Sequence, residues 1–349
     1  RRWVVTFTLL QGISLSPLIY FAFNGGLTLT TMFTCAILYW GAGMLAGPCW
    51  NTWITSIVPT RIQTHFFARR TRGMQIASLI GFLVGGFALR YLPNGSIATA
   101  AFAPLFAGAL LARGFSVLLL LKQPETTSPK QECFPKEVSP LHVWDHFQQG
   151  TKYGKIVAYL FVFQFAVHTA SPFINPYMLH HIGFTYSQYA LLIAAMYFSK
   201  ILVLPFVGAG IRKRGCDKYM RVGGTFVAII PALFMVSHSF YWLLVVQLLS
   251  GVFWAAFELS SLLTLLNSLP QKNRTAHLSY FHFCNALALG LSSLLGGFLL
   301  KKVGMNGYMV LFAGSAVLRI STIFFLRYIT SRKPRSTPVI PEELNKQAA

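Results

Sequence analysis

One polar stretch, residues 122–155, divides an otherwise apolar chain: KQPETTSPKQECFPKEVSPLHVWDHFQQGTKYGK. Four long apolar runs precede it, at 3–23, 27–54, 74–92 and 99–121. Six more follow it, at 156–178, 187–210, 222–238, 240–266, 279–299 and 306–328. A helix of about 20 apolar residues crosses the hydrocarbon core of a bilayer. The sequence therefore predicts an all-α membrane protein with transmembrane helices in two groups, four before the linker and six after it.

The composition supports a membrane protein over a soluble one. Of the 349 residues, 54% are hydrophobic and only 11% are charged, whereas a soluble protein usually carries about 25% charged residues. The net charge of +21 would suit a nucleic-acid-binding protein. In a membrane protein, however, basic residues collect in the cytoplasmic loops, and this accounts for the charge without nucleic acid.

The basic residues also predict the orientation. We place the termini and every second connection in the cytoplasm, and 23 of the 29 Lys and Arg residues then lie on that side. Such asymmetry follows the rule that cytoplasmic loops are positively charged. We therefore expect a multi-pass protein of the plasma (inner) membrane with both termini in the cytoplasm.

Motifs for metal, cofactor and ATP binding are absent from the sequence. The five cysteines show no paired spacing and no Cys/His ligand set. No G-x-x-x-x-G-K-[ST] loop, H-E-x-x-H or G-x-S-x-G is present. We therefore expect no cofactor and no metal site, and the sequence does not suggest an enzyme.

The two groups of helices resemble each other at an offset of 211 residues. Pro59 matches Pro270, and the pair Gly85-Gly86 matches Gly296-Gly297. An internal duplication explains the shared spacing, although Gly and Pro are also common in membrane helices in general. Duplicated halves should contain equal numbers of helices. The split of four and six therefore predicts an N-terminally truncated protein with ten of twelve helices.

This architecture resembles the major facilitator superfamily, whose members have two six-helix bundles, a long cytoplasmic central loop and both termini in the cytoplasm. The segment 208–215, GAGIRKRG, is similar to the weaker second copy of the family's loop motif. Gly208, Lys213 and Gly215 fit the motif, whereas Arg212 stands where the family has an acidic residue. The resemblance implies half-bundles at 1–121 and 156–330, the central loop at 122–155 and a cytoplasmic tail at 331–349.

A second cluster of basic residues, Arg69, Arg70 and Arg72, follows a Trp-rich segment, and this arrangement is similar to a bacterial subgroup of the family. We expect these residues, together with 212–218, to clamp the two halves together on the cytoplasmic side. They are also candidates for contact with anionic lipid headgroups.

Two charged residues lie at similar depths in the predicted second half. A charge at the bilayer centre is costly, so it usually faces a cavity or a partner. Lys200 and Glu258 differ in depth by about 4–5 Å at a rise of 1.5 Å per residue, which predicts an ion pair. The pair would be a proton- or substrate-linked switch; the alternatives are a static structural pair, or side chains that never meet.

A polar stripe marks the helix predicted at 156–178. Gln164, His168 and Ser171 follow i, i+4, i+7 spacing, and Asn175 continues the same face. The stripe indicates a pore-lining face or, alternatively, hydrogen bonding between helices. Pro172 and Pro176 predict a break in this helix, and broken helices in transporters often mark the substrate region.

Three further residues complete the candidate set. Trp254 is a candidate for the same cavity, although simple packing is the more common role for such a residue. Arg113 and Arg319 lie in helices that support the bundles from outside in the resembling family. For these two residues we expect structural or snorkelling roles.

The resemblance implies a secondary active transporter that moves a small solute by alternating access, with protons as the candidate coupling ion. Lipid would be its surroundings and a monomer its working form. The alternative is a non-transporting descendant of the family, such as a receptor, a scaffold or an inactive fragment.

Overall fold

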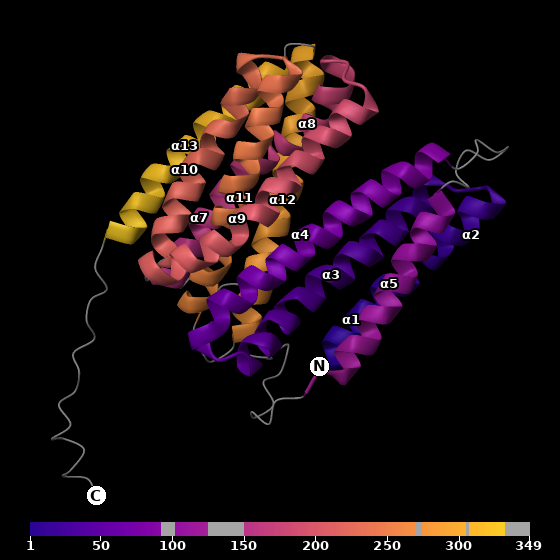
Figure 1. The fold of residues 1–349 in the computed structure, drawn as a ribbon, viewed down its shortest axis with the longest axis horizontal. Helices are drawn as coiled ribbons and strands as arrows, with labels where there is room; N and C mark the ends of the chain where they lie inside the picture. The colour runs from indigo at the N-terminus through magenta and orange to yellow at the C-terminus, as the bar shows by residue number, and fades with distance from the viewer. Residues whose placement is uncertain (92–101, 125–149, 270–273, 305–306, 332–349) are drawn as a thin grey trace, which may run out of the picture.

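The computed structural model describes residues 1–91, 102–124, 150–269, 274–304 and 307–331. The first group of helices is α1 (Arg2–Ile13), α2 (Ser16–Asn24), α3 (Leu29–Ile57), α4 (Thr60–Tyr91) and α5 (Ala103–Lys122). The second group is α7 (Lys152–His168), η2 (Ser171–Phe173), α8 (Ile174–Pro176), η3 (Tyr177–His181), α9 (Tyr186–Arg214), α10 (Cys216–Val236), α11 (Phe240–Ser268), α12 (Arg274–Val303) and α13 (Gly307–Ser331). Figure 1 shows them as two bundles that approach each other near one end. The predicted all-α, two-bundle architecture is confirmed.

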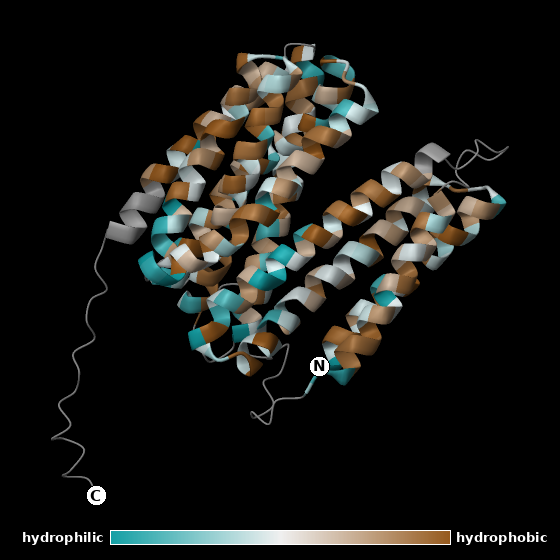
Figure 2. Ribbon diagram, viewed as in Figure 1, coloured by the Kyte–Doolittle hydropathy of each residue, from teal (hydrophilic) through white to brown (hydrophobic). Residues whose placement is uncertain are grey.

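Nine segments among the described residues are long and apolar enough to cross a membrane. The tenth predicted run, 74–92, lies in the second part of α4. The interior of the predicted linker, 125–149, and the tail from 332 onward lie outside the described residues, but the helices that flank the linker end at Lys122 and begin again at Lys152. Figure 2 shows hydrophobic residues along the lengths of both bundles, as lipid contact requires.

The segment between the predicted apolar runs at 27–54 and 74–92 is not a loop throughout, because the chain is helical from Thr60 onward. The helix α4 begins at Thr60, directly after Pro59, and continues without interruption to Tyr91. The basic cluster Arg69, Arg70 and Arg72 is therefore helical. The physical reason is that hydropathy marks where a helix leaves the apolar layer, whereas hydrogen bonding decides where the helix ends.

The two bundles touch through α4 against α9 and through α3 against α12. Gly208 of α9 allows the closest approach: an added Cβ there would lie 2.8 Å from the Cβ of Ala68 on α4. Across the second contact, the Thr275 hydroxyl donates to the Thr52 hydroxyl at 3.0 Å. These residues lie at the ends of helices next to the basic segments, so the bundles are joined at one end (Figure 1).

The matched glycine pairs have different surroundings in the two halves. An added Cβ on Gly296 would collide with the backbone oxygen of Thr169 and with the Phe173 ring, which shows that α12 and the end of α7 pack backbone to backbone. Gly85 and Gly86 have nothing within 4 Å among the described residues. Among the described residues, close packing at this position is therefore seen in the second half.

Candidate functional site

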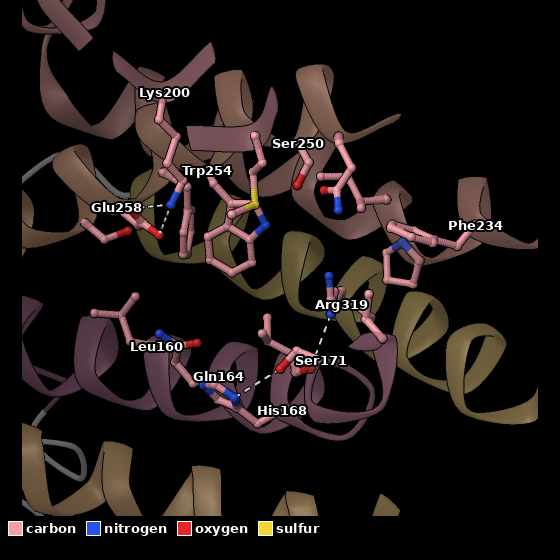
Figure 3. Close-up of a pocket in the computed structure, with 18 of the residues that line it drawn as sticks. Leu160, Gln164, His168, Ser171, Lys200, Phe234, Ser250, Trp254, Glu258 and Arg319 are labelled. Atoms are coloured by element: carbon pink, nitrogen blue, oxygen red, sulfur yellow. Dashed lines mark hydrogen bonds and ion pairs between the residues drawn. The ribbon is translucent and has the colours of Figure 1, made fainter. Parts of the chain in front are cut away.

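A cavity of about 530 Å³ lies inside the second bundle. Helices α7 to α13 all contribute to its wall, and its lining includes all six residues predicted for a substrate or proton pathway: Gln164, His168, Asn175, Lys200, Trp254 and Glu258. In Figure 3 the side chains of α9 and α11 face those of α7 across this space. The structure therefore brings together residues that are up to 94 positions apart in the sequence, from Gln164 to Glu258.

The polar stripe of α7 faces the cavity. Gln164, His168, Ser171 and Asn175 all line it, and the Nδ1 atom of His168 lies 3.2 Å from the Ser171 hydroxyl. The helix ends at His168 and is followed by short 3-10, α and π segments. The predicted break is thus present, because the prolines lack the backbone N–H groups that a continuous helix needs.

Lys200 of α9 and Glu258 of α11 form a bidentate ion pair. The Lys200 ammonium donates to the two carboxylate oxygens at 2.9 and 3.1 Å. The Lys200 side chain is 9% exposed, whereas that of Glu258 is 40% exposed. The ammonium is therefore buried behind the carboxylate, and the carboxylate is the partner that reaches the open space of the cavity.

Close packing of α9 and α11 brings the side chains of Lys200 and Glu258 within hydrogen-bonding distance of each other. Gly251 lies two turns before Glu258, and an added Cβ there would collide with the Ser199 hydroxyl and the carbonyl of Met196. Absence of a side chain at Gly251 thus lets the backbones approach, as small residues do in membrane bundles. The approach places Lys200, next to Ser199, within reach of α11.

Of the two roles expected for Arg319, structural or snorkelling, the structure shows the structural one, and it places the residue at the cavity. Its side chain is 2% exposed and lines the cavity. The guanidinium donates to the carbonyl oxygen of Val227 on α10 at 3.1 Å and to that of Val167 on α7 at 3.3 Å. Arg319 therefore joins three helices, and in Figure 3 it projects toward the space between the two walls.

The other membrane arginine, Arg113, has the structural role that was expected. It is half-buried on α5 and donates to the hydroxyl of Tyr39 on α3 at 3.0 Å. Its guanidinium also lies 5.5 Å from the centre of the Tyr39 ring. Arg113 does not line the cavity.

Several polar residues of the cavity were not predicted. Gln247, Ser250 and Ser261 of α11 are buried and line it together with Trp254 and Glu258. They recur at helical spacing on one face of α11, so the rule that found the stripe on α7 would also have found this one. Trp254 lies edge-on to Phe257, with ring centres 6.0 Å apart, and supplies an aromatic wall.

The residues expected to clamp the two halves together, here called the gate residues, lie at the end where the bundles meet, but their basic side chains do not form the contact. Arg69 and Arg72 are exposed, as are Arg212 and Lys213 at the end of α9. The contact is made by small and apolar groups: Phe67 and Ala68 are buried in one cluster with residues of α9. The physical reason is that like-charged side chains repel, whereas apolar surfaces associate.

Two of these gate residues have defined local roles. Arg70 lies over the ring of Trp50 on α3, 3.9 Å from its centre, in a cation–π contact within the first bundle. Burial lowers the pKa of Arg70 from its ordinary value of 12.5. Gly215 has a φ of +83° and connects α9 to α10, a conformation that favours glycine.

Among the described residues, no group of three or more His, Cys, Asp or Glu side chains is arranged to hold a metal ion. The chemistry of the cavity is therefore that of one carboxylate, two cations, one imidazole and several neutral polar groups. Such a set can bind a small polar or charged solute and can exchange a proton.

Comparisons with known proteins agree with this architecture. The chain superposes on a variant of the E. coli fucose:proton symporter FucP with a TM-score of 0.70 and 11% identity, covering 95% of this chain and 84% of that one. It also superposes on an outward-facing bacterial homologue of the iron transporter ferroportin, with a TM-score of 0.65, 14% identity and coverage of 94% and 83%. At such low identity, these structures show the fold alone.

A search of curated proteins finds no match to the sequence. The family model described as Major Facilitator Superfamily matches residues 156–348, which is more than half of the chain. This match covers the second bundle, and thus all the residues that line the cavity. The predicted family is confirmed: this chain belongs to the major facilitator superfamily.

Proposed function

We propose that this membrane transport protein is a secondary active transporter that moves a small solute by alternating access. Family membership supports transport, and the cavity supplies a place for the solute. Its volume, about 530 Å³, lies in the range of about 300–1,000 Å³ that small-molecule sites occupy. The observation that carries the proposal is that polar stripes on α7 and α11 converge on this one space.

We further propose that the joined end of the bundles faces the cytoplasm, in the plasma membrane. The exposed basic residues Arg69, Arg72, Arg212 and Lys213 lie at that end, which supports this orientation through the positive-inside rule. The described conformation is then open to the outside. The likeness to a structure of FucP in its outward conformation, at a TM-score of 0.70 and 11% identity, is in keeping with this assignment.

We assign proton coupling to the pair of Glu258 and Lys200. The exposed carboxylate can take up a proton from water in the cavity, and the buried ammonium then loses its counter-charge. The other charged or titratable groups in this cavity are His168 and Arg319. Protonation of Glu258 therefore changes the electrostatic balance of the site, and this change would favour one access state over the other.

The test is flux in proteoliposomes with an imposed pH gradient, using panels of labelled sugars, organic anions, nucleosides and peptides. We expect the native chain to accumulate one class of solute when the gradient is present. Glu258→Gln should abolish accumulation but retain exchange of labelled for unlabelled solute, because exchange requires no net proton movement. Asp217→Asn is the matched control, since Asp217 makes a surface ion pair with Lys152 at 3.7 Å outside the cavity.

Two results would overturn the proposal in different ways. Full gradient-driven accumulation by Glu258→Gln would remove this carboxylate from the coupling mechanism and leave transport intact. Absence of flux and exchange for every solute class, in a folded protein, would favour a non-transporting member of the family.

A further inference from the structure

The charges in the cavity do not balance. Among the described lining residues, the formal charges are those of Lys200, Glu258 and Arg319. Lys200 and Glu258 neutralise each other at 2.9 and 3.1 Å. Arg319 has only carbonyl oxygens as acceptors among the described residues, those of Val167 and Val227. The cavity therefore carries one uncompensated positive charge.

Arg319 is also incompletely hydrogen-bonded. Its side chain is 2% exposed, and its Nε atom is buried without a hydrogen-bond partner in the described part of the chain. A guanidinium has five N–H donors, of which two are used. Burying a charged donor without a full set of acceptors is costly, so such a group usually has an anionic partner.

The wall next to Arg319 can complete an anion site. Arg319 donates to the carbonyl of Val167, which directly precedes His168 on the stripe of α7. The Ser171 hydroxyl lies one turn further along and contacts the His168 ring. Ser171 and Gln164, which also line the cavity, supply further neutral donors. Phe234 and Trp254 provide apolar surface near this point (Figure 3).

We propose that the cavity binds a small monocarboxylate with an apolar body, and that its carboxylate pairs with Arg319. This inference rests on the proposed function, since it names the class of solute that the transporter would carry. A monoanion matches the single uncompensated charge, whereas the doubly charged form of phosphate would leave one negative charge unbalanced. A cation would be repelled, because the one carboxylate in the described lining is already paired with Lys200.

The geometry of the guanidinium favours a carboxylate in particular. A guanidinium can give two parallel hydrogen bonds to the two oxygens of a carboxylate, a match that an ammonium cannot make. The apolar part of the solute would then lie against Trp254 and Phe234, where it loses contact with water. Binding of such an anion would raise the number of Arg319 donors in use from two to four. It would also cancel the excess charge.

The test uses the purified full chain in detergent with four probes: benzoate, 3-methylbutanoate, the neutral isostere benzamide, and inorganic phosphate. We expect the two carboxylates to bind and to raise the thermal midpoint, and benzamide and phosphate to do neither. Charge-assisted hydrogen bonds of this kind correspond to about a 10- to 100-fold difference in affinity. Arg319→Lys should therefore bind benzoate about 10-fold more weakly, and Arg319→Gln at least 100-fold more weakly.

Arg113→Gln is the matched control. It removes a membrane arginine that hydrogen-bonds to Tyr39 and does not line the cavity, so the affinity for benzoate should stay at the native value. If Arg319→Gln fails to fold, Arg319→Lys and the comparison of benzoate with benzamide still decide the question.

Any one of four results would overturn the inference. These are equal binding of benzoate and benzamide, native affinity for benzoate in Arg319→Lys, tighter binding of phosphate than of benzoate, and no carboxylate binding by the native chain. Flux measurements separate this failure from a failure of transport. If benzoate binds in a manner that depends on Arg319 but no solute is transported, the proposal of transport is refuted and the carboxylate site is still supported. Transport of a neutral solute that benzoate does not inhibit would support transport and refute the site.

Discussion

Replacement of Glu258 by Gln should destabilise the protein more than replacement of Lys200 by Met. The reason is the unequal burial of the pair, since the Lys200 side chain is 9% exposed and the Glu258 side chain 40%. Loss of the carboxylate leaves a buried ammonium without its counter-charge. Loss of the ammonium leaves a carboxylate that water in the cavity can still hydrate.

The magnitudes follow from these exposures. Removing one partner of a fully buried pair costs about 3–5 kcal/mol. The exposure of Glu258 weakens the native interaction, so we expect Glu258→Gln to lower the free energy of unfolding by about 2–3 kcal/mol. Lys200→Met should cost about 1 kcal/mol, the net value of a typical hydrogen bond. The double variant should also cost only about 1 kcal/mol, because it leaves no buried charge unpaired.

The assay is reversible unfolding of the purified protein in mixed micelles at neutral pH, for the native chain, both single variants and the double variant. The double-variant cycle should give a coupling of about 2–3 kcal/mol. If the two single effects add to within about 0.5 kcal/mol, the side chains do not interact energetically and the argument fails. A larger effect for Lys200→Met than for Glu258→Gln would refute the assignment of the ammonium as the buried partner.

Three further predictions concern helix contacts. Gly251→Ala should lower the free energy of unfolding by about 1–3 kcal/mol, because it overpacks α9 against α11. Gly290 has nothing within 4 Å, so Gly290→Ala should leave the free energy of unfolding unchanged or higher. Equal decreases in the two variants would show that the close approach of α9 and α11 is unimportant. Gly208→Val should push Ala68 away and raise hydrogen–deuterium exchange in the first turns of α4, and unchanged exchange would argue against this contact. Tyr153→Phe removes a 2.8 Å hydrogen bond to a carbonyl of α12 and should lower the free energy of unfolding by about 1 kcal/mol; no change would mean that another donor replaces the hydroxyl.

The candidate site was largely predictable where a residue's spacing or depth carried the information. The stripe of Gln164, His168 and Ser171 follows from helical periodicity, and it does line the cavity. The contact between Lys200 and Glu258 follows from their similar depths in two helices that cross the membrane in the same direction. Both arguments use only the rise and turn of a helix, which are fixed by backbone hydrogen bonding.

The position of Arg319 in the cavity lining was not predicted, because its role was inferred from the usual position of its helix and not from its own neighbours. Ser315 and Thr322 stand at i−4 and i+3 from it, and all three are buried. The same spacing rule would have marked an inward polar face on α13. The course of residues 60–73 was missed for another reason: hydropathy reports the edges of the apolar layer, and α4 extends beyond them.

The described residues that line the cavity, from Leu160 to Arg319, all belong to one bundle. If the bundles move as rigid bodies during transport, the distances among these residues stay the same in every state. For a given protonation state of Glu258, the site would then have nearly the same intrinsic affinity on both sides of the membrane, and the first bundle would only decide which compartment it meets. Under that condition the protein imposes no direction of its own, and the concentration and proton gradients alone determine whether solute enters or leaves the cell.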